Sequence, residues 1–178
     1  MKNISKLKSK LIPVNRPKVF PSDIKNVVKA LKENWISGDG PYVKKFESNF
    51  AKLHNRKYAI SVSNGTAALE VALKSLNLKK GSEVIIPAFS IISTALCVIK
   101  NNFKPILVDV DLGTWNMSPE QIIKKINKKT KAIIITHIYG FPVDMKKILD
   151  IAKKKNIFII EDAAEMIGQR YKNKLCGS

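Results

Sequence analysis

The spacing of apolar residues changes along this chain, and each change predicts a helix or a strand. Near the N-terminus, Ile24, Val27, Val28 and Leu31 recur at helical spacing, and a second helix is expected over Tyr42–Leu53. From residue 58 onward, short runs rich in Ile and Val alternate with helical segments, which is typical of buried parallel strands joined by helices. The predicted strands are 58–62, 83–86, 105–108, 132–136 and 157–161, and the predicted helices between them are 66–76, 93–100, 119–126 and 145–155.

The ends of these elements carry their own signals. The segment Trp35–Pro41 holds two glycines and a proline, so we expect a loop there. Ser118 precedes Pro119 and is predicted to cap its helix, and Asp144 is predicted to cap the last helix in the same way. The alternation of strands and helices indicates an α/β fold with a mainly parallel sheet between helical layers, a three-layer arrangement.

One strand-to-helix junction has the composition of a phosphate cradle. The apolar run 58–60 breaks at Asn64-Gly65-Thr66, and a helix with an apolar face begins at once. Such a turn leaves backbone N–H groups free at the positive end of the helix dipole. The same residues could serve only the geometry of the turn, and the junction alone does not decide between the two.

A second feature lies almost a hundred residues further on. The apolar strand 157–161 leads into Asp162, which is followed by two alanines that would let a flat group approach. Carboxyl ends of parallel strands are where open α/β sheets bind ligands. Pyridoxal phosphate requires a cradle for its phosphate and an acid that keeps its ring nitrogen protonated. Gly65, Thr66 and Asp162 are candidates for these two roles, although Asp162 could also be a capping or solvent-facing residue.

Six blocks in order resemble the DegT/DnrJ/EryC1/StrS sugar aminotransferases, pyridoxal-phosphate enzymes of fold type I. The blocks are 35–40, 63–69, 105–109, 137–140, 161–165 and 168–177. The resemblance implies that Asp162 pairs with the pyridine nitrogen, that Gly65 and Thr66 bind the phosphate, and that Glu165 contacts the ring's 3′-oxygen. It also implies a catalytic Schiff-base lysine beyond Ser178, so we assign no residue of this chain to that role.

One position departs from the family pattern, and other positions carry weaker expectations. Ile91 stands where the family usually has an aromatic residue that stacks on the cofactor, so it would cover the ring without π-stacking. His137, which follows a strand, is a candidate for substrate contact or for a structural role. Trp35, Ser37 and Gly38 resemble a loop that meets the substrate or a second subunit, and could equally be a helix-terminating loop.

The resemblance implies amination of a nucleotide-linked 4-keto-6-deoxy sugar to the 4-amino sugar, with glutamate as the amino-acid donor, by a cytoplasmic homodimer. Two alternatives remain: a pyridoxal-phosphate-dependent nucleotide-sugar 3-dehydratase, and a non-catalytic remnant. We expect residues 1–20 to be an N-terminal extension and residues 21–178 to be a partial cofactor-binding large domain, truncated before the last sheet strands and the C-terminal domain. Alone, such a chain would be inactive and would leave the strand at 58–62 without a partner.

The amino-acid composition argues against nucleic-acid binding, membrane insertion and secretion. The 178 residues carry a net charge of +18, but only three of the 32 basic residues are arginines, and we expect a solvated lysine surface and no nucleic-acid partner. No apolar stretch approaches the ~20 residues that span a membrane, and the basic leader 1–10 lacks a secretion-signal core. The two cysteines are expected to be reduced, and Asp109 and Asp111 to shape a turn, with no metal site.

Overall fold

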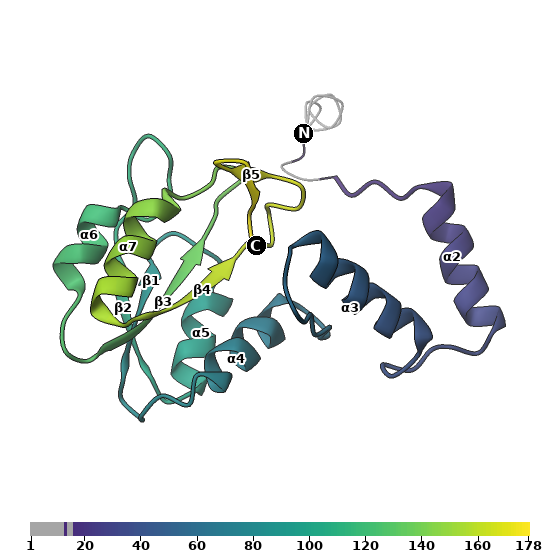
Figure 1. The fold of residues 1–178 in the computed structure, drawn as a ribbon, viewed down its shortest axis with the longest axis horizontal. Helices are drawn as coiled ribbons and strands as arrows, with labels where there is room; N and C mark the ends of the chain where they lie inside the picture. The colour runs from purple at the N-terminus through teal and green to yellow at the C-terminus, as the bar shows by residue number, and fades with distance from the viewer. Residues whose placement is uncertain (1–12, 14–15) are drawn as a thin grey trace, which may run out of the picture. The chain divides into compact units, whose positions relative to one another are not determined.

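The computed structural model describes residues 13 and 16–178, which Figure 1 draws as a coloured ribbon. The chain divides into two compact units, residues 1–46 and residues 47–178. Most of the predicted N-terminal extension, residues 1–20, and the whole leader 1–10 lie outside the described residues. The elements are α2 (Pro21–Lys32), α3 (Pro41–Leu53), α4 (Gly65–Ser75), β1 (Glu83–Pro87), α5 (Ser93–Lys100), β2 (Lys104–Val108), α6 (Pro119–Lys125), β3 (Thr130–Thr136), α7 (Met145–Lys155), β4 (Phe158–Asp162), β5 (Arg170–Tyr171) and β6 (Lys174–Leu175).

The first unit holds α2 and the loop that follows it. Asp23 accepts a hydrogen bond from the backbone N–H of Phe20 (2.9 Å), which fixes the start of α2. Asn34 adopts a positive φ of 60° just after the helix, and Trp35 N–H donates back to Ala30 (2.9 Å). The Trp35 ring lies so close to Gly40 that an added Cβ there would be 3.0 Å from it. The predicted loop after α2 is therefore confirmed.

The second unit is built on a four-stranded parallel sheet with the order β2-β1-β3-β4. Helices α4 and α5 cover one face and α6 and α7 cover the other (Figure 1). Because all four strands run in the same direction, their carboxyl ends share one edge of the sheet. The α/β class and the mainly parallel sheet predicted from the sequence are confirmed.

Alternation along the strands divides the core into two clusters. Ile85 and Ile133 pack with the α6 and α7 side, while Val84 and Ile134 pack with the α4 and α5 side. All four side chains are buried. A strand that is apolar at every position is therefore explained by a sheet with helices on both faces.

The prediction of a strand at 58–62 is wrong. This segment forms no strand, and Tyr58 and Ile60 remain about three-quarters exposed (74% and 77%). A strand requires a neighbour to receive its backbone hydrogen bonds. No strand of the described sheet pairs with this segment, and its apolar pattern alone could not reveal that.

The two predicted helix caps have different outcomes. Ser118 accepts from Gln121 N–H (3.3 Å), which confirms its role at the start of α6. Asp144 makes no capping hydrogen bond, so that prediction is wrong. Instead, the Tyr171 hydroxyl lies 2.5 Å from Asp144 Oδ1 and 3.4 Å from Lys146 N, so a residue from β5 supplies the contact to the first turn of α7.

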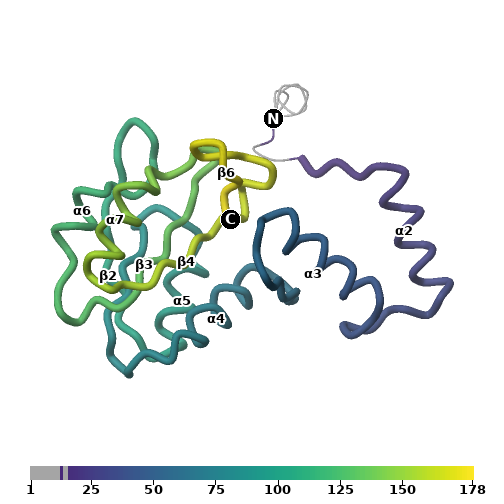
Figure 2. Tube along the Cα trace, in the orientation of Figure 1, coloured from purple at the N-terminus to yellow at the C-terminus, as the bar shows by residue number. Residues whose placement is uncertain are grey.

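After β4 the chain passes through the β5–β6 hairpin and returns to β4 near its end, as Figure 2 shows. Gly177 N–H donates to Glu161 of β4 (2.6 Å), which ties the returning segment to the sheet. Cys97 and Cys176 are both free and buried. Asp111 accepts from Gly113 and Thr114 N–H (both 3.0 Å), which is the expected turn role.

Candidate functional site

A cavity of about 380 Å³ opens at the carboxyl edge of the sheet. Its volume is that of a small-molecule site. Its walls come from the segment after β1, from the end of β3 and the turn behind it, and from the end of β4. The lining residues are Phe89, Ser90, Ile91, Thr136, His137, Ile138, Tyr139, Asp162, Ala164 and Glu165.

Asp162 is the acid that the end of β4 brings into this cavity. Its Oδ1 accepts a hydrogen bond from Ala164 N–H (3.2 Å), while its Oδ2 makes no hydrogen bond to the described residues. Its backbone carbonyl accepts from His137 N–H (3.2 Å), which fixes it against the end of β3. The carboxylate is thus held by its own turn and keeps one oxygen for a ligand.

The N-terminus of α4 has the geometry of an anion cradle. Asn64 caps the helix by accepting from Ala67 N–H (2.9 Å), and the N–H groups of Gly65 and Thr66 have no hydrogen-bond acceptor among the described residues. An added Cβ on Gly65 would meet no atom within 4 Å, so the space beside these donors is open. Such a helix start suits a phosphate group.

The cradle and the acid lie at the same edge of the sheet. The Thr66 hydroxyl is 2.7 Å from the Ser93 hydroxyl at the start of α5, the helix that follows β1. The start of α4 therefore lies at the carboxyl end of β1, on the side where β4 ends in Asp162. The two candidate anchors, the Gly65–Thr66 turn and Asp162, therefore lie at the same edge of the sheet.

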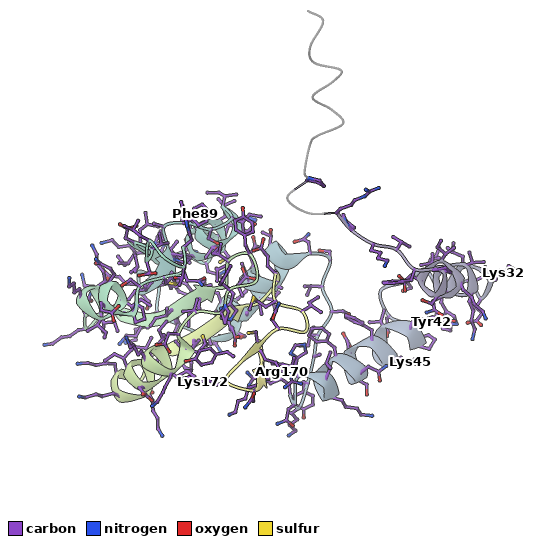
Figure 3. All side chains as sticks on the ribbon, turned by 90° about the horizontal axis from the view of Figure 1, so that it is seen from above. Lys32, Tyr42, Lys45, Phe89, Arg170 and Lys172 are labelled. Carbon is purple, nitrogen blue, oxygen red and sulfur yellow. The ribbon has the colours of Figure 1, made fainter. Side chains whose placement is uncertain are left out.

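Ile91 lines the cavity and is two-thirds exposed (67%), so its side chain is available to a ligand. The ring of the neighbouring Phe89 packs against the ring of Trp115, with ring centroids 5.4 Å apart. Figure 3 shows Phe89 at the margin of the unit, away from Arg170 and Lys172 on the hairpin. Phe89 and Ile91 both line the cavity, and Ile91 is the more exposed of the two (67% against 39%), so it is the side chain more available to a flat ligand.

Glu165 holds the turn on the opposite wall. Its Oε2 accepts from Tyr139 N–H (2.6 Å), and Tyr139 and Gly140 both have positive φ (48° and 84°) in a two-residue turn between Ile138 and Phe141. One oxygen of Glu165 is thus used on the protein itself. The predicted contact of Glu165 with a cofactor oxygen stays a prediction.

His137 is fully buried, and both of its ring nitrogens have partners. Nδ1 accepts from Val143 N–H (3.1 Å), and Nε2 lies 2.9 Å from Glu161 Oε1. Burial would raise the pKa of Glu161, but the hydrogen bonds from His137 and from Gly177 outweigh it, and the pKa of Glu161 is lowered. Substrate contact by His137 stays a prediction, and its side chain is already occupied in this structure.

Two functional supports were missed by sequence reasoning. Glu161 belongs to the block 161–165, but nothing in its position before Asp162 revealed its contact with His137. Asn116 is buried and clamps the turn, because its Oδ1 accepts from Ile138 N–H (3.1 Å) and its Nδ2 donates to Phe141 O (2.9 Å). A polar residue between Trp115 and Met117 was the only available signal for it, and that signal is weak.

A larger cavity of about 510 Å³ lies beside α7, the outer side of β4 and the hairpin. It is lined by Ile159 and Glu161, whereas Asp162 lines the smaller cavity. Adjacent residues of a strand point to opposite faces, so the two cavities are separate. Asp162 does not line the larger cavity, and we therefore assign the candidate site to the smaller one.

Trp35, Ser37 and Gly38 lie in the first unit. There the Ser37 hydroxyl accepts from Asp39 N–H (3.2 Å), and Trp35 packs on Gly40, so these residues shape their own loop. Their predicted contact with a substrate stays a prediction. Within the part of the chain that the structure describes, no helix has the length and apolar character needed to cross a membrane.

Comparison with known proteins agrees with this geometry. Residues 18–178 match the model of the DegT/DnrJ/EryC1/StrS aminotransferase family. GDP-perosamine synthase of Escherichia coli O157:H7 is 43% identical over 169 residues, which are 95% of this chain and 46% of that protein. The chain spans about half the length of the curated relatives it matches.

Solved structures show the same fold. An aminotransferase from Psychrobacter cryohalolentis superimposes with a TM-score of 0.84 at 35% identity, covering 93% of this chain and 42% of that one. The E. coli GDP-4-keto-6-deoxy-D-mannose-3-dehydratase with bound hydrated PLP gives a TM-score of 0.88 at 29% identity, covering 94% and 44%.

Proposed function

Because this chain belongs to the DegT/DnrJ/EryC1/StrS aminotransferase family, we propose that it builds the cofactor pocket of a pyridoxal-phosphate-dependent nucleotide-sugar aminotransferase. The observation that carries the proposal is the placement of Asp162 and of the open helix start at Gly65 and Thr66 on one edge of the sheet. An acid and an anion cradle at one edge of the sheet would supply the two protein anchors that this cofactor requires besides its lysine.

The residues present fit pyridoxal phosphate. When bound, that cofactor supplies an electron sink for reactions at a carbon attached to nitrogen. The N–H groups of Gly65 and Thr66, with the Thr66 hydroxyl, would bind its phosphate. Asp162 would hold a proton at the ring nitrogen, Ile91 would pack on a ring face and keep water from it, and Glu165 would contact the ring's 3′-oxygen with its second carboxylate oxygen.

The proposed reaction is amination of a nucleotide-linked 4-keto-6-deoxy sugar, with glutamate as donor, by a cytoplasmic homodimer. The identity of 43% to a GDP-perosamine synthase supports this choice of substrate class. Trp35, Ser37, Gly38 and His137 are proposed substrate-side residues. We also propose that residues 1–178 transfer no amino group by themselves, since none of their lysines matches the position of the catalytic one.

A second candidate is a nucleotide-sugar 3-dehydratase that uses the same cofactor. The observation that favours it is the TM-score of 0.88 with the E. coli dehydratase. The two candidates share the pocket and differ in what becomes of the sugar. Product mass would separate them, because amination at C4 retains the 3-hydroxyl and dehydration removes it.

The test of the shared pocket is binding of pyridoxamine 5′-phosphate to residues 1–178, measured by calorimetry. This probe has no aldehyde, so it forms no adducts with the 29 lysines (32 basic residues less three arginines). We expect saturable binding that Asp162→Asn weakens at least tenfold, about 1.4 kcal/mol. Asp150→Asn, at the other cavity, is the matched control. Equal affinities of the two variants, or no saturable binding, would overturn the proposal.

A further inference from the structure

The ends of β3 and β4 are joined by a hydrogen-bonded lock that passes through one carboxylate oxygen. Glu161 Oε1 lies 2.9 Å from His137 Nε2 and also accepts from Gly177 N–H (2.6 Å). The His137 ring is fully buried, and the Glu161 side chain is 16% exposed. Gly177 is held in turn by Arg56, whose Nε donates to Gly177 O (3.3 Å). This lock ties β3, β4 and the returning chain segment together.

The geometry fixes where the proton of the His137 ring lies. Nδ1 accepts the N–H of Val143, so Nδ1 offers a lone pair and carries no proton. The ring proton is then on Nε2 and is donated to Glu161 Oε1. The hydrogen bond made by one ring nitrogen sets the role of the other. A carboxylate acceptor makes this bond stronger than one between neutral groups.

The lock borders the candidate cofactor pocket on two sides. Asp162 directly follows Glu161, and its carbonyl accepts the backbone N–H of His137 (3.2 Å). The turn with Tyr139 directly follows His137, and its amide is held by Glu165 from the β4 side (2.6 Å). His137 therefore contacts the β4 end through both its backbone and its ring, and a change in the lock would move Asp162 relative to the opposite wall.

We propose that His137 and Glu161 are a positioning pair that sets the Asp162 carboxylate against the pocket through the Nε2-protonated form of His137. Neither side chain needs to touch the cofactor for this role. The inference rests on the proposed function only in the part that Asp162 plays. The lock itself stands on the hydrogen bonds given above.

The same side chains could be mistaken for a metal site. His137 Nε2, a Glu161 oxygen and Cys176 Sγ all lie within 4.8 Å of one another. A metal on Nε2 would force the ring proton onto Nδ1, where it would face the N–H of Val143. The contact to Val143 therefore opposes metal binding and favours the lock.

The test begins with nitrogen NMR of the histidine rings in ligand-free residues 1–178. The chain has only two histidines, and His54→Phe identifies the signals of His137. We expect a proton on Nε2, none on Nδ1, and slow exchange of the Nε2 proton with water. A proton on Nδ1 in the wild-type chain would overturn the inference, and so would loss of the Nε2 proton signal on addition of Zn²⁺. The proton positions are measured in the wild-type chain, and a folded His54→Phe variant serves only to assign the signals.

Two variants then test the positioning role. Glu161→Gln keeps an Oε1 that can accept from both His137 and Gly177, whereas Glu161→Leu removes it. We expect Glu161→Gln to retain the slowly exchanging proton and to bind pyridoxamine 5′-phosphate within about threefold of wild type. A folded Glu161→Leu should lose that proton signal and bind at least tenfold more weakly.

The outcomes separate this inference from the proposed function. If the wild-type chain binds no pyridoxamine 5′-phosphate, the proposed function fails, while the proton position on His137 still decides the lock. If wild type binds the probe and a folded Glu161→Leu binds it equally well, the positioning role fails although the function stands. If Glu161→Gln falls to the level of Glu161→Leu, the oxygen acceptor is not what matters, and the inference is also overturned.

Discussion

β3 and α2 are both rich in branched apolar side chains, yet they end in opposite environments. Every residue of β3 except Lys131 is buried, because strands flank it on both sides and helices cover both faces. Helix α2 buries none of its residues, and Ile24 and Val27 are more than half exposed (58% and 59%). The comparison teaches that local pattern selects the element, whereas neighbours decide whether its apolar surface is buried.

The candidate pocket lies in the well-packed region of the molecule, the one that contains β3. It is formed where β1, β3 and β4 end, and these strands contribute side chains to both apolar clusters. Its residues therefore rest on elements held by a packed core. The segment 58–62, which leads into the start of α4, belongs to the other kind of region, with its apolar side chains exposed.

The largest expected effect sets a core residue against an exposed one. Ile134→Ala in β3 should lower the free energy of unfolding by about 2–5 kcal/mol, because it removes a fully buried side chain. Ile24→Ala in α2 should change it by about 0.5 kcal/mol or less. Urea unfolding of residues 1–178, followed by circular dichroism, measures both. Equal losses of unfolding free energy would mean that α2 is as well packed as β3, which would contradict the difference between the two elements.

A smaller effect separates backbone strain from binding within the pocket region. Gly140 has a φ of 84°, so Gly140→Ala should cost about 1–2 kcal/mol of stability. Gly65 opens α4 with free space beside it, and Gly65→Ala should leave stability unchanged or raise it by up to about 1 kcal/mol.

Ligand binding should also distinguish Gly65→Ala from Gly140→Ala. The added methyl at Gly65 would fill the space beside the free N–H groups, so we expect Gly65→Ala to weaken binding of pyridoxamine 5′-phosphate without loss of stability. Thermal unfolding and calorimetry on one preparation measure both quantities. If Gly65→Ala binds the probe as wild type does, the start of α4 is a structural turn and not a phosphate cradle.

The sequence predicted the sheet better than it predicted the contacts between elements. The Ile- and Val-rich runs located all four strands of the sheet, because burial on both faces leaves a continuous apolar pattern. The segment 58–62 has a similar pattern and forms no strand, since pairing depends on a partner that the pattern does not encode. Gly65, Thr66, Ile91, Asp162 and Glu165 were identified from motifs, and all except Gly65 and Thr66 line the cavity.

Long-range contacts account for what was missed. The contact of Glu161 with His137 joins residues 24 apart in the chain, and the clamp by Asn116 joins residues 22 and 25 apart. The contact of Tyr171 with Asp144 replaced the predicted cap in the same way. Local spacing cannot reveal these partners, because they come together only when the strands are in register.

The smallest expected effect is a pH dependence. The pKa of Glu161 is lowered below its ordinary value of 4.5, so its contribution to stability is fully present above pH 4.5 and is lost as the pH falls through the lower, folded-state pKa. The difference in unfolding free energy between wild type and Glu161→Gln should therefore be constant from pH 7 to 5. Below about pH 4.5 the free energy of unfolding of wild type should fall relative to that of Glu161→Gln. A difference that stays constant through this range would contradict the assigned ionisation.

The most direct test of the central claim is an NMR titration of isotope-labelled residues 1–178 with pyridoxamine 5′-phosphate. One ligand is expected to contact the start of α4 and the end of β4 together. The largest amide shifts should therefore occur at Gly65 and Thr66 and at Asp162 to Ala164, all saturating at one ligand concentration. Shifts confined to lysine-rich helix surfaces or to the cavity beside α7, with Gly65 and Asp162 unmoved, would contradict this expectation.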